Sequence, residues 1–320
     1  PYHIIGKPRK FDPRAYVRLK RHIREVKPDI VHTWLFAANS YGRKAALAAG
    51  VKQIVAGERC VDRWKQWPHF AIDRYLARKT SCIVTNSEGV KQFYTGHGIA
   101  AEKFAIIPNG IVTPDAVSDD QREQARQAVC KNLGLPAETK LIGAIGRLWP
   151  QKNYKHLMWS MCLLKEIRKD FHLLACGEGP HRQRLEKYRD QVHIADHVTL
   201  LGERDDVAEL LPAMHAFVNA SDYEGQSNGI MEAMATGLPV VASDIPGNRD
   251  LIVPEQTGYL TPPGDRADMA RWLNVLLDDP ALARKFGEAG RRRMLEQSSV
   301  EQMVSRHTNL YRELMGQSHG

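Results

Sequence analysis

Charged side chains gather in two glycine-containing segments in the second half of the chain. The first spans residues 146–153 and reads Gly-Arg-Leu-Trp-Pro-Gln-Lys-Asn, directly after a short apolar run. The forked guanidinium of Arg147 can hold two oxygens, Lys152 adds a second positive charge, and Gly146 lets the backbone come close to a ligand. These residue types predict a site for a diphosphate, although a solvated basic loop has the same composition.

The second segment, residues 221–239, carries two glutamates. Glu224 falls in a loop after an apolar run, and Glu232 falls about one turn into the helix that follows. Carboxylates accept hydrogen bonds from paired hydroxyls, which suits a ribose or a hexose. The start of that helix offers free backbone N–H groups to an anion, at Gln226, Ser227, Asn228, Gly229 and Ile230. A capped helix with two solvated glutamates is the competing interpretation.

Both segments belong to an alternation of short apolar runs and helical stretches, which predicts parallel sheets. In the first third the apolar runs are 2–5, 30–32, 53–56, 82–85 and 105–107, and the helical stretches are 13–26, 39–49, 68–78 and 88–97. After a polar linker at 113–121 the apolar runs are 141–145, 172–175, 198–201, 216–219 and 239–243. Ligands of such sheets bind at the carboxyl ends of the strands, where both charged segments fall.

We therefore predict an α/β protein with two Rossmann-like, doubly wound domains facing each other across a cleft. The first domain covers residues 1–112, the second covers 113–299, and a C-terminal helix covers 300–320. Ser299 and Gln302 predict a capping box for that helix, whose apolar face is expected to pack on the first domain. Because the chain starts at Pro1 within an apolar run, we expect the first domain to lack its opening strands.

The composition narrows the classes of function. The 320 residues carry a net charge of +8 with a pI near 9.2, which favours anionic partners. Nucleic acid is not expected among them, because no recognised binding motif accompanies the charge. Five cysteines without a close pair predict neither a disulfide framework nor a zinc site, and we expect no metal. No apolar run is long enough to cross a bilayer, and these features together predict a cytoplasmic protein.

The segment Glu224-x7-Glu232, followed by Ala-Met-Ala-x-Gly-x-Pro-Val-Val-Ala, resembles the Glu-x7-Glu signature of retaining glycosyltransferases of family 4, which have the GT-B fold. The segment 146–153 is similar to the diphosphate loop of that family. Shorter motifs at 86–87, 107–110, 177–180, 198–204 and 258–260 follow the family's order, so the resemblance covers essentially the whole chain.

The resemblance implies a role for each of these residues. Arg147 and Lys152 would hold the diphosphate of the donor, and Glu232 would bind the ribose hydroxyls. Glu224 would face the transferred sugar, and Arg204 would lie near the nucleobase. The family uses no divalent metal, and the nucleotide sugar is a co-substrate, so no cofactor is expected.

Two departures from the family concern the first domain. The family opens with a strand and a Gly-rich loop near the donor phosphate, and neither is present here. At roughly thirty residues per strand–helix unit, about two units would precede Pro1. The segment 29–34 resembles a family segment that often holds a second histidine, where this chain has Trp34.

Three residues remain as candidates on the acceptor side. His32 is a candidate catalytic residue, and Trp34 and Arg59 are candidates for binding the acceptor. A packed or capping role is the simpler interpretation of His32, and an ion pair with Glu58 is the simpler interpretation of Arg59.

These observations predict a retaining, metal-independent glycosyltransferase. It would move a hexose-type sugar from a nucleotide sugar, with UDP favoured over GDP, to a glycan or lipid-linked acceptor in cell-envelope or exopolysaccharide synthesis. We favour attack on the face that the leaving group departs from, because no carboxylate of the first domain stands out as a nucleophile. Three alternatives stay open: a sugar-nucleotide epimerase, a non-catalytic nucleotide-sugar-binding protein, and a basic membrane-surface or nucleic-acid module.

The helix expected at 13–26 raises one further hypothesis. Its basic residues are Arg14, Arg18, Lys20, Arg21 and Arg24, with Lys27 directly after it. A sheet-covering helix with a solvated basic face is the simpler interpretation. The sharper hypothesis is peripheral contact with anionic lipid at the inner face of the membrane, as a lipid-linked acceptor would require.

Overall fold

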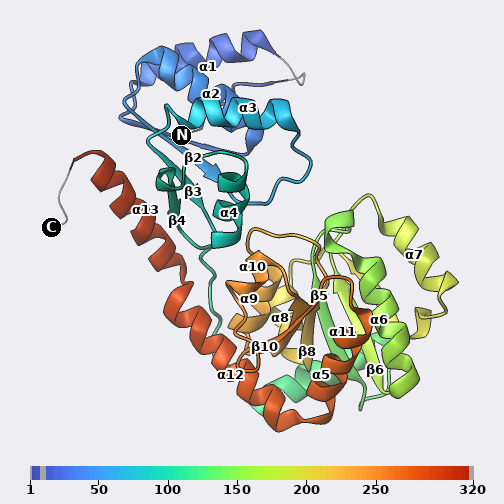
Figure 1. The fold of residues 1–320 in the computed structure, drawn as a ribbon. Coiled ribbons are helices and arrows are strands. Elements are labelled where there is room, and N and C mark those ends of the chain that lie inside the picture. The colour runs from blue at the N-terminus through green and yellow to red at the C-terminus, as the bar shows by residue number, and fades with distance from the viewer. Residues whose placement is uncertain (1, 8–11, 317–320) are drawn as a thin grey trace. The chain divides into compact units, whose positions relative to one another are not determined.

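The computed structural model describes residues 2–7 and 12–316, which form two compact α/β units. Unit 1 runs to Pro108 and resumes at Met303, and unit 2 runs from Asn109 to Gln302. Each unit is built on a parallel sheet with helices packed against it (Figure 1). The predicted α/β class with two Rossmann-like domains is confirmed, and the sequence analysis had set the boundaries at 112/113 and 299/300.

Unit 1 contains a four-stranded parallel sheet in the order β1-β2-β3-β4. Its strands are β1 (Ile30–Trp34), β2 (Gln53–Glu58), β3 (Cys82–Thr85) and β4 (Phe104–Ile106). Its helices are α1 (Pro13–Val26), α2 (Phe36–Ala49), α3 (Trp67–Ala77) and α4 (Glu88–Gly96), together with most of α13 (Val300–Leu314).

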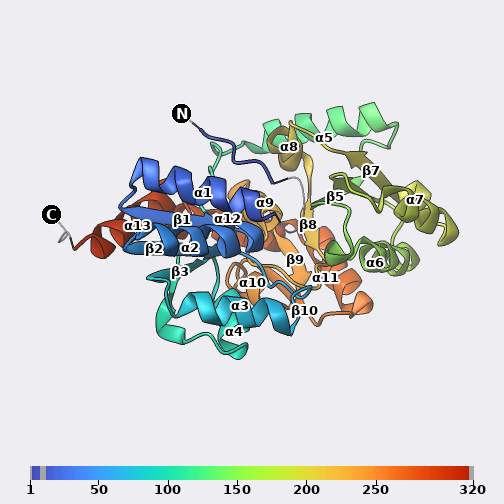
Figure 2. The same ribbon diagram turned by 90° about the horizontal axis from the view of Figure 1, so that it is seen from above.

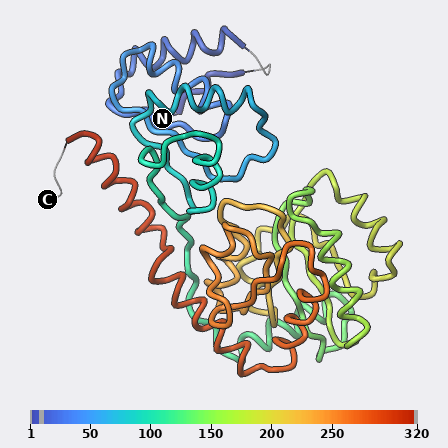
Figure 3. The backbone as a smooth tube through the Cα atoms, viewed as in Figure 1, coloured from blue at the N-terminus to red at the C-terminus, as the bar shows by residue number. Residues whose placement is uncertain are grey.

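The side chains of β2 point alternately to the two faces of the unit 1 sheet, and different helices cover each face. Ile54 and Ala56 point to the face that α1 to α4 cover, whereas Val55 points to the opposite face. On that opposite face Val55 lies in one apolar cluster with Met303 and Leu310 of α13. The tube in Figure 3 shows this last helix running beside the strands of unit 1. Strands that are buried on both faces explain why their sequences are almost continuously apolar.

Unit 2 contains a six-stranded parallel sheet in the order β10-β9-β8-β5-β6-β7. Its strands are β5 (Lys140–Ile145), β6 (Phe171–Cys176), β7 (Val198–Gly202), β8 (Ala216–Asn219), β9 (Val240–Ser243) and β10 (Gly258–Thr261). The chain winds outward from β5 to β7 and then returns to β8 at the other side of β5. This reversal between β5 and β8 is the place where doubly wound sheets bind ligands.

Helices cover both faces of the sheet of unit 2. Apolar side chains of α6 (Tyr154–Ile167), α7 (Arg182–Gln191), α11 (Arg266–Asp278) and α12 (Pro280–Gln297) form one core. Those of α5 (Asp119–Leu133), α8 (Val207–Leu210), α9 (Asn228–Ala235) and the segment after α10 (Pro246–Arg249) form the other. Both cores extend to the β5–β8 reversal, so the loops there emerge from a rigid base.

Helix ends follow from local sequence signals. Asp12 caps α1 by accepting hydrogen bonds from the N–H groups of Arg14 and Ala15, and Pro13 occupies the first helical position. Ser299 and Gln302 bond reciprocally at the start of α13, so the predicted capping box is confirmed.

Two expectations about the elements were wrong, and one strand was missed. Residues 2–5 form no strand, and Tyr2 and Ile4 are exposed, because this short apolar run pairs with no strand in the described part of the chain. The linker expected at 113–121 ends early, because Ser118 and Gln121 form a capping box that starts α5 at Asp119. Strand β10 was missed, because residues 258–260 were noted only as a short motif.

None of the helices among the described residues combines the length and the apolar character that spanning a bilayer requires.

Candidate active site

The two charged segments found in the sequence lie side by side in unit 2. They follow β5 and β8, which are hydrogen-bonded neighbours in the sheet. The backbone N–H of Asp222 donates to the carbonyl of Gln151 at 2.9 Å, and the Asn153 side chain donates to the Asp222 carboxylate at 2.8 Å. The Gln151 side chain donates to the carbonyl of Tyr223 at 2.8 Å. The two loops therefore form one hydrogen-bonded surface.

Lys152 and Glu224 form an ion pair across these loops. The Glu224 oxygen that binds Lys152 also accepts a hydrogen bond from the Ser221 hydroxyl at 2.8 Å, and its other oxygen accepts one from Gln151 at 3.3 Å. Only 8% of the Glu224 side chain is exposed, against 18% for Lys152. The buried carboxylate thus fixes the direction of an ammonium that remains accessible to a ligand.

Gly146 lies directly against this lysine. A Cβ at this position would lie 3.1 Å from Cε of Lys152, closer than side-chain carbons ordinarily approach. The Tyr154 hydroxyl donates to the carbonyl of Gly146 at 3.0 Å and fixes the turn from the other side. Replacing Gly146 would therefore displace the Lys152 side chain.

Arg147 differs from Lys152 in being exposed. Its guanidinium lies 5.6 Å from the ring centre of Trp149, and within the described ranges no carboxylate pairs with it. Stacking on an aromatic ring restricts the side chain while leaving its N–H donors available to a ligand. The structure thus brings both predicted cations to one edge of the sheet.

Glu232 is the fifth residue of α9 and is partly buried. Burial raises the pKa of Glu232 above its ordinary value, and the positive charge of Lys152 opposes that rise. Glu232 thus lies within electrostatic range of Lys152, which forms its ion pair with Glu224. The charge of one lysine therefore acts on both glutamates of the Glu-x7-Glu segment.

The start of α9 offers a ligand mainly its backbone N–H groups. Ser227 accepts a hydrogen bond from Asn219 at 3.3 Å, and Ile230 is fully buried in the core. A Cβ on Gly229 would lie 3.1 Å from the carbonyl oxygen of Ile145 at the end of β5. The N–H groups of the first helical turn have no acceptors within the helix, so these residues could bind an anion through the backbone.

Asn109 ties this helix start to the beginning of unit 2. Its backbone N–H donates to the Gln226 side chain at 2.8 Å, and its amide donates to the Asn228 side chain at 2.8 Å. The sequence analysis noted the motif at 107–110 but gave Asn109 no role.

The loop after β6 packs against the β5 loop and supports it. The carbonyl of Glu178 accepts a hydrogen bond from the N–H of Leu148 at 2.9 Å. A Cβ on Gly177 would collide with the carbonyl of Gly146, and one on Gly179 would lie 2.7 Å from the carbonyl of Leu148. Glycines at these two positions let the loops pack backbone to backbone.

Arg204, predicted to lie near the nucleobase, is engaged within its own loop. Its guanidinium binds both oxygens of Asp206, and both side chains are about two-fifths exposed. The contact between Arg204 and a base therefore stays a prediction.

His32 and Trp34 lie in unit 1, stacked on each other with ring centres 4.2 Å apart. Nδ1 of His32 lies 2.7 Å from the Tyr311 hydroxyl of α13, and burial lowers the pKa of His32 to about 4. The ring is therefore neutral at pH 7 and a weak base. The Arg59 guanidinium lies 5.3 Å from the ring centre of Trp34, so these two acceptor-side candidates are neighbours in unit 1.

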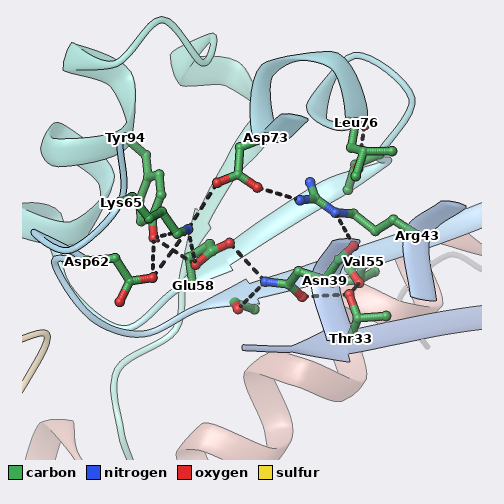
Figure 4. Close-up of polar contacts among 12 residues, drawn as sticks. Thr33, Asn39, Arg43, Val55, Glu58, Asp62, Lys65, Asp73, Leu76 and Tyr94 are labelled. Atoms are coloured by element: carbon green, nitrogen blue, oxygen red, sulfur yellow. Dashed lines mark hydrogen bonds and ion pairs between the residues drawn. The ribbon is translucent and has the colours of Figure 1, made fainter. Parts of the chain in front are cut away.

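A buried ionic network lies at the carboxyl ends of β1 and β2 in unit 1 (Figure 4). Lys65 contacts Asp73 at 3.0 Å, Asp62 at 3.3 Å and Glu58 at 3.5 Å, and its side chain is fully buried. The remaining members are Arg43, which pairs with Asp73, Asn39, which donates to Glu58, and Tyr94, which donates to Glu58 and accepts from Lys65. The sequence analysis missed this network.

Family models match both units of the chain. The model described as glycosyl transferases group 1 matches residues 125–293, and the model described as Glycosyltransferase Family 4 matches residues 1–114. The chain belongs to the glycosyl transferases group 1 family. It is accordingly a glycosyltransferase with the GT-B fold, as the Glu-x7-Glu segment predicted.

Individual members of the glycosyltransferase family extend this comparison. The chain is 29% identical to the 2-deoxystreptamine glucosyltransferase of Streptomyces kanamyceticus over 80% of this chain and 66% of that protein. It is 28% identical to the UDP-Gal:alpha-D-GlcNAc-diphosphoundecaprenol alpha-1,3-galactosyltransferase of Escherichia coli over 85% of this chain and 72% of that protein. The chain spans about two thirds to three quarters of these relatives.

A solved structure shows the same fold. Anabaena Alr3699/HepE, determined in complex with UDP and glucose, superposes with a TM-score of 0.85 at 20% identity. The superposition covers 97% of this chain and 84% of that one.

Several residues of this glycosyltransferase site were not found from the sequence. Gln151, Ser221 and Asn109 hold Lys152, Glu224 and the start of α9 in place. Their only sequence signal is their position next to the charged residues in loops after strands. Asn153 was quoted with the diphosphate loop, and the structure gives it a role in joining that loop to Asp222.

Proposed function

We propose that this glycosyltransferase moves a hexose-type sugar from a nucleoside-diphosphate sugar to a glycan or lipid-linked acceptor, with retention of configuration. The observation that carries the proposal is the meeting of Arg147, Lys152, Glu224 and Glu232 at the β5–β8 reversal. The two cations suit a diphosphate and the two carboxylates suit the hydroxyls on either side of it. The names of the relatives, which include a glucosyltransferase and a UDP-galactose-dependent enzyme, support a hexose and a uridine nucleotide.

In the proposed reaction, the acceptor hydroxyl attacks the anomeric carbon on the face that the diphosphate leaves. The bond from the anomeric carbon to the phosphate oxygen breaks, the acceptor oxygen bonds to that carbon, and the acceptor proton passes to the departing phosphate oxygen. Arg147, Lys152 and the N–H groups of the α9 start stabilise the negative charge that develops on the leaving group. We assign no proton transfer to His32, because its pKa of about 4 makes it a weak base at neutral pH.

Metal independence is part of the proposal. Two positive side chains already suit the two charges of the diphosphate, so the reaction would not need a divalent cation to neutralise them. Transfer that continues unchanged in the presence of a chelator would support this, and restoration of lost activity by added Mg²⁺ or Mn²⁺ would contradict it.

The exchange of each glutamate for glutamine tests the assigned roles. Glu232→Gln should weaken binding of both free uridine diphosphate and the intact donor, by about 1.5–3 kcal/mol for a lost bond to a charged group. Glu224→Gln should chiefly impair the sugar donor, with a smaller loss for the free nucleotide because it also releases Lys152. Calorimetric titration with uridine diphosphate and with the sugar donor separates the two effects.

Glu209→Gln, at an exposed position on α8, is the matched control and should bind as the wild-type protein does. Equal losses for free nucleotide in the two site variants would contradict the division of roles. Binding of the donor without transfer to any acceptor would favour the non-catalytic alternative, and release of an epimerised sugar would favour the epimerase.

A further inference from the structure

Unit 1 exposes a group of large apolar side chains around the start of α2 and α3. We call this group the apolar platform, and its members are Leu35 (78% exposed), Trp64 (54%), Trp67 (78%), Ile72 (43%) and Tyr75 (59%). Single exposed apolar residues are ordinary, but a group with two tryptophans marks a surface that contacts something apolar.

The aromatic rings of the platform region contact one another. Phe36 lies 5.4 Å from Trp64 and 5.2 Å from His69, and Trp64 lies 5.3 Å from His69. Leu35 and Phe36 directly follow Trp34, one of the predicted acceptor-side residues. The platform is therefore continuous along the chain with the acceptor side of unit 1.

Leu35 is both exposed and strained. Its φ of 70° and ψ of 148° put a leucine in a backbone region that disfavours side chains with a Cβ. Its carbonyl accepts a hydrogen bond from the N–H of Asn39 at 2.7 Å, which holds the conformation. A glycine would relieve the strain, so packing within the folded chain does not account for a leucine here.

An apolar groove of about 680 Å³ opens beside the platform. It is lined by α1, α2 and α3, with Tyr16, Phe36, Tyr41, Ile72 and Tyr75 among the lining residues. Figure 2 shows α2 lying between α1 and α3 in this unit. Ile72 and Tyr75 belong to both the groove and the platform, so the two form one apolar surface.

The buried ionic network of Figure 4 holds this surface in place. Lys65 lies between Trp64 and the segment that starts α3, and it points inward while both tryptophans point outward. Its ammonium joins Glu58 of β2 to Asp73 of α3 and lies 5.0 Å from the ring centre of Phe36. The loop is thus anchored by charges from within, which leaves its tryptophans available to solvent.

Exposed cations lie on the same elements as the platform, and Lys44 lines the groove itself. On α1, α2, the loop before α3, α3 and its C-terminal end they are Arg14, Arg18, Lys44, Arg63, Arg74 and Arg78. A second copy of the chain docking through the same face would bring these cations together, which disfavours a symmetric dimer. An anionic lipid surface satisfies both the cations and the tryptophans, which favour the boundary between headgroups and hydrocarbon.

We propose that the apolar platform docks unit 1 on an anionic lipid bilayer, with Leu35, Trp64 and Trp67 at the headgroup boundary and the groove facing the lipid. The inference rests on the proposed function in one respect, since it supplies the place where a lipid-linked acceptor would meet the enzyme. It differs from the basic-helix hypothesis, because it assigns the apolar contact to the platform and leaves α1 as a flanking source of charge.

Vesicle flotation with the full chain tests the proposal. The protein should float with vesicles of phosphatidylcholine containing phosphatidylglycerol, and much less with phosphatidylcholine alone. Trp67→Ser should lower the partition coefficient by about tenfold, since burying one large apolar side chain is worth about one factor of ten. Trp159→Ser, at an exposed position of α6 in unit 2, is the matched control and should float as the wild-type protein does.

Leu35→Gly separates docking from folding. Because glycine relieves the positive φ, this variant should unfold at the same or a higher temperature while binding vesicles less tightly. Failure to float with anionic vesicles, or platform variants that float normally, would overturn the proposal. A dimer in sedimentation experiments that Trp67→Ser dissociates would also overturn it, in favour of a protein partner.

Nucleotide binding keeps this test independent of the proposed function. The platform variants should bind uridine diphosphate like the wild-type protein, because the predicted nucleotide site lies in unit 2. Normal nucleotide binding without flotation would reject the docking surface alone, whereas flotation without nucleotide binding would reject the proposed function alone.

Discussion

Unit 1 and unit 2 each place a lysine–glutamate pair at the carboxyl edge of a parallel sheet, and the two pairs differ in what surrounds them. Lys65 is fully buried and contacts three carboxylates, so its charge is used within the fold. Lys152 is partly accessible and, among the residues that the structure describes, forms an ion pair with one carboxylate, that of Glu224, while Arg147 beside it is exposed. The same residue types at the same place in the topology therefore serve a scaffold in one unit and, in the proposed function, ligand binding in the other. The number of internal partners, rather than the motif, distinguishes the two cases.

Removing the buried lysine should have the largest effect. Lys65→Met leaves Glu58, Asp62 and Asp73 without their shared cation, and breaking a buried pair in this way costs about 3–5 kcal/mol of unfolding free energy. Urea unfolding followed by circular dichroism measures the loss. Lys79→Met, at an exposed position of the same unit, should change the stability by less than about 0.5 kcal/mol. Similar stabilities for the two variants would show that the network is not a scaffold.

Removing the accessible lysine should affect binding more than folding. Lys152→Ala should weaken binding of uridine diphosphate by about 1.5–3 kcal/mol, the range for a hydrogen bond to a charged group. Calorimetric titration measures this loss, and Lys187→Ala, at an exposed position on α7, should leave binding unchanged. A Lys152→Ala variant that binds normally but unfolds easily would reverse the comparison between the two lysines.

The pH dependence of stability should include a contribution from His32, beside those of His172 and His215, whose pKa values burial lowers in the same direction. The folded pKa of His32, about 4, lies below the ordinary value of 6.5, so between these values the unfolded chain binds a proton at His32 that the folded chain does not. The contribution of His32 is therefore complete above pH 6.5 and falls as the pH drops towards 4. Because the ring keeps some access to solvent, His32→Asn should remove on the order of 1 kcal/mol of that fall. Thermal unfolding between pH 7 and 4.5 tests this, with His3→Asn at an exposed position as the control.

Glu232 should give the smallest effect, seen only in binding. Burial raises its pKa above the ordinary value, so the carboxylate becomes protonated at a higher pH than an exposed glutamate. Binding of uridine diphosphate should weaken by about a few-fold as the pH falls towards that raised pKa, where only part of the carboxylate is protonated, because the protonated group accepts hydroxyl hydrogen bonds less well. The phosphates titrate in both proteins, so the difference between wild type and Glu232→Gln isolates the carboxylate. Parallel pH profiles would show that Glu232 does not contact the nucleotide.

The sequence predicted those features that depend on neighbours in the chain. Helix α1 and strand β8 have the predicted bounds, because apolar periodicity and capping residues act locally. Arg147, Lys152, Glu224 and Glu232 come together because doubly wound sheets collect the loops after their strands at one edge.

The features that were missed depend on distant partners. Residues 2–5 have the apolar character of a strand, but a strand also needs an adjacent strand, and no local signal supplies one. Lys65 looks like a surface lysine in a polar loop, and only the folding of β2 and α3 around it reveals that it is buried. Burial of charge is a tertiary property, so the network could not be inferred from spacing.

The backbone contacts at Gly177 and Gly179 bear on how a mutational scan of this enzyme should be interpreted. A saturation library scored for transfer would show both positions as intolerant to every substitution, with profiles like those of residues that touch the substrate. Yet the nearest atoms that a Cβ would meet at each glycine are backbone atoms of the β5 loop, so the loss would arise from a displaced loop rather than from a lost ligand contact. Engineers seeking a new donor specificity should keep these two positions fixed and vary the side chains that the loop presents.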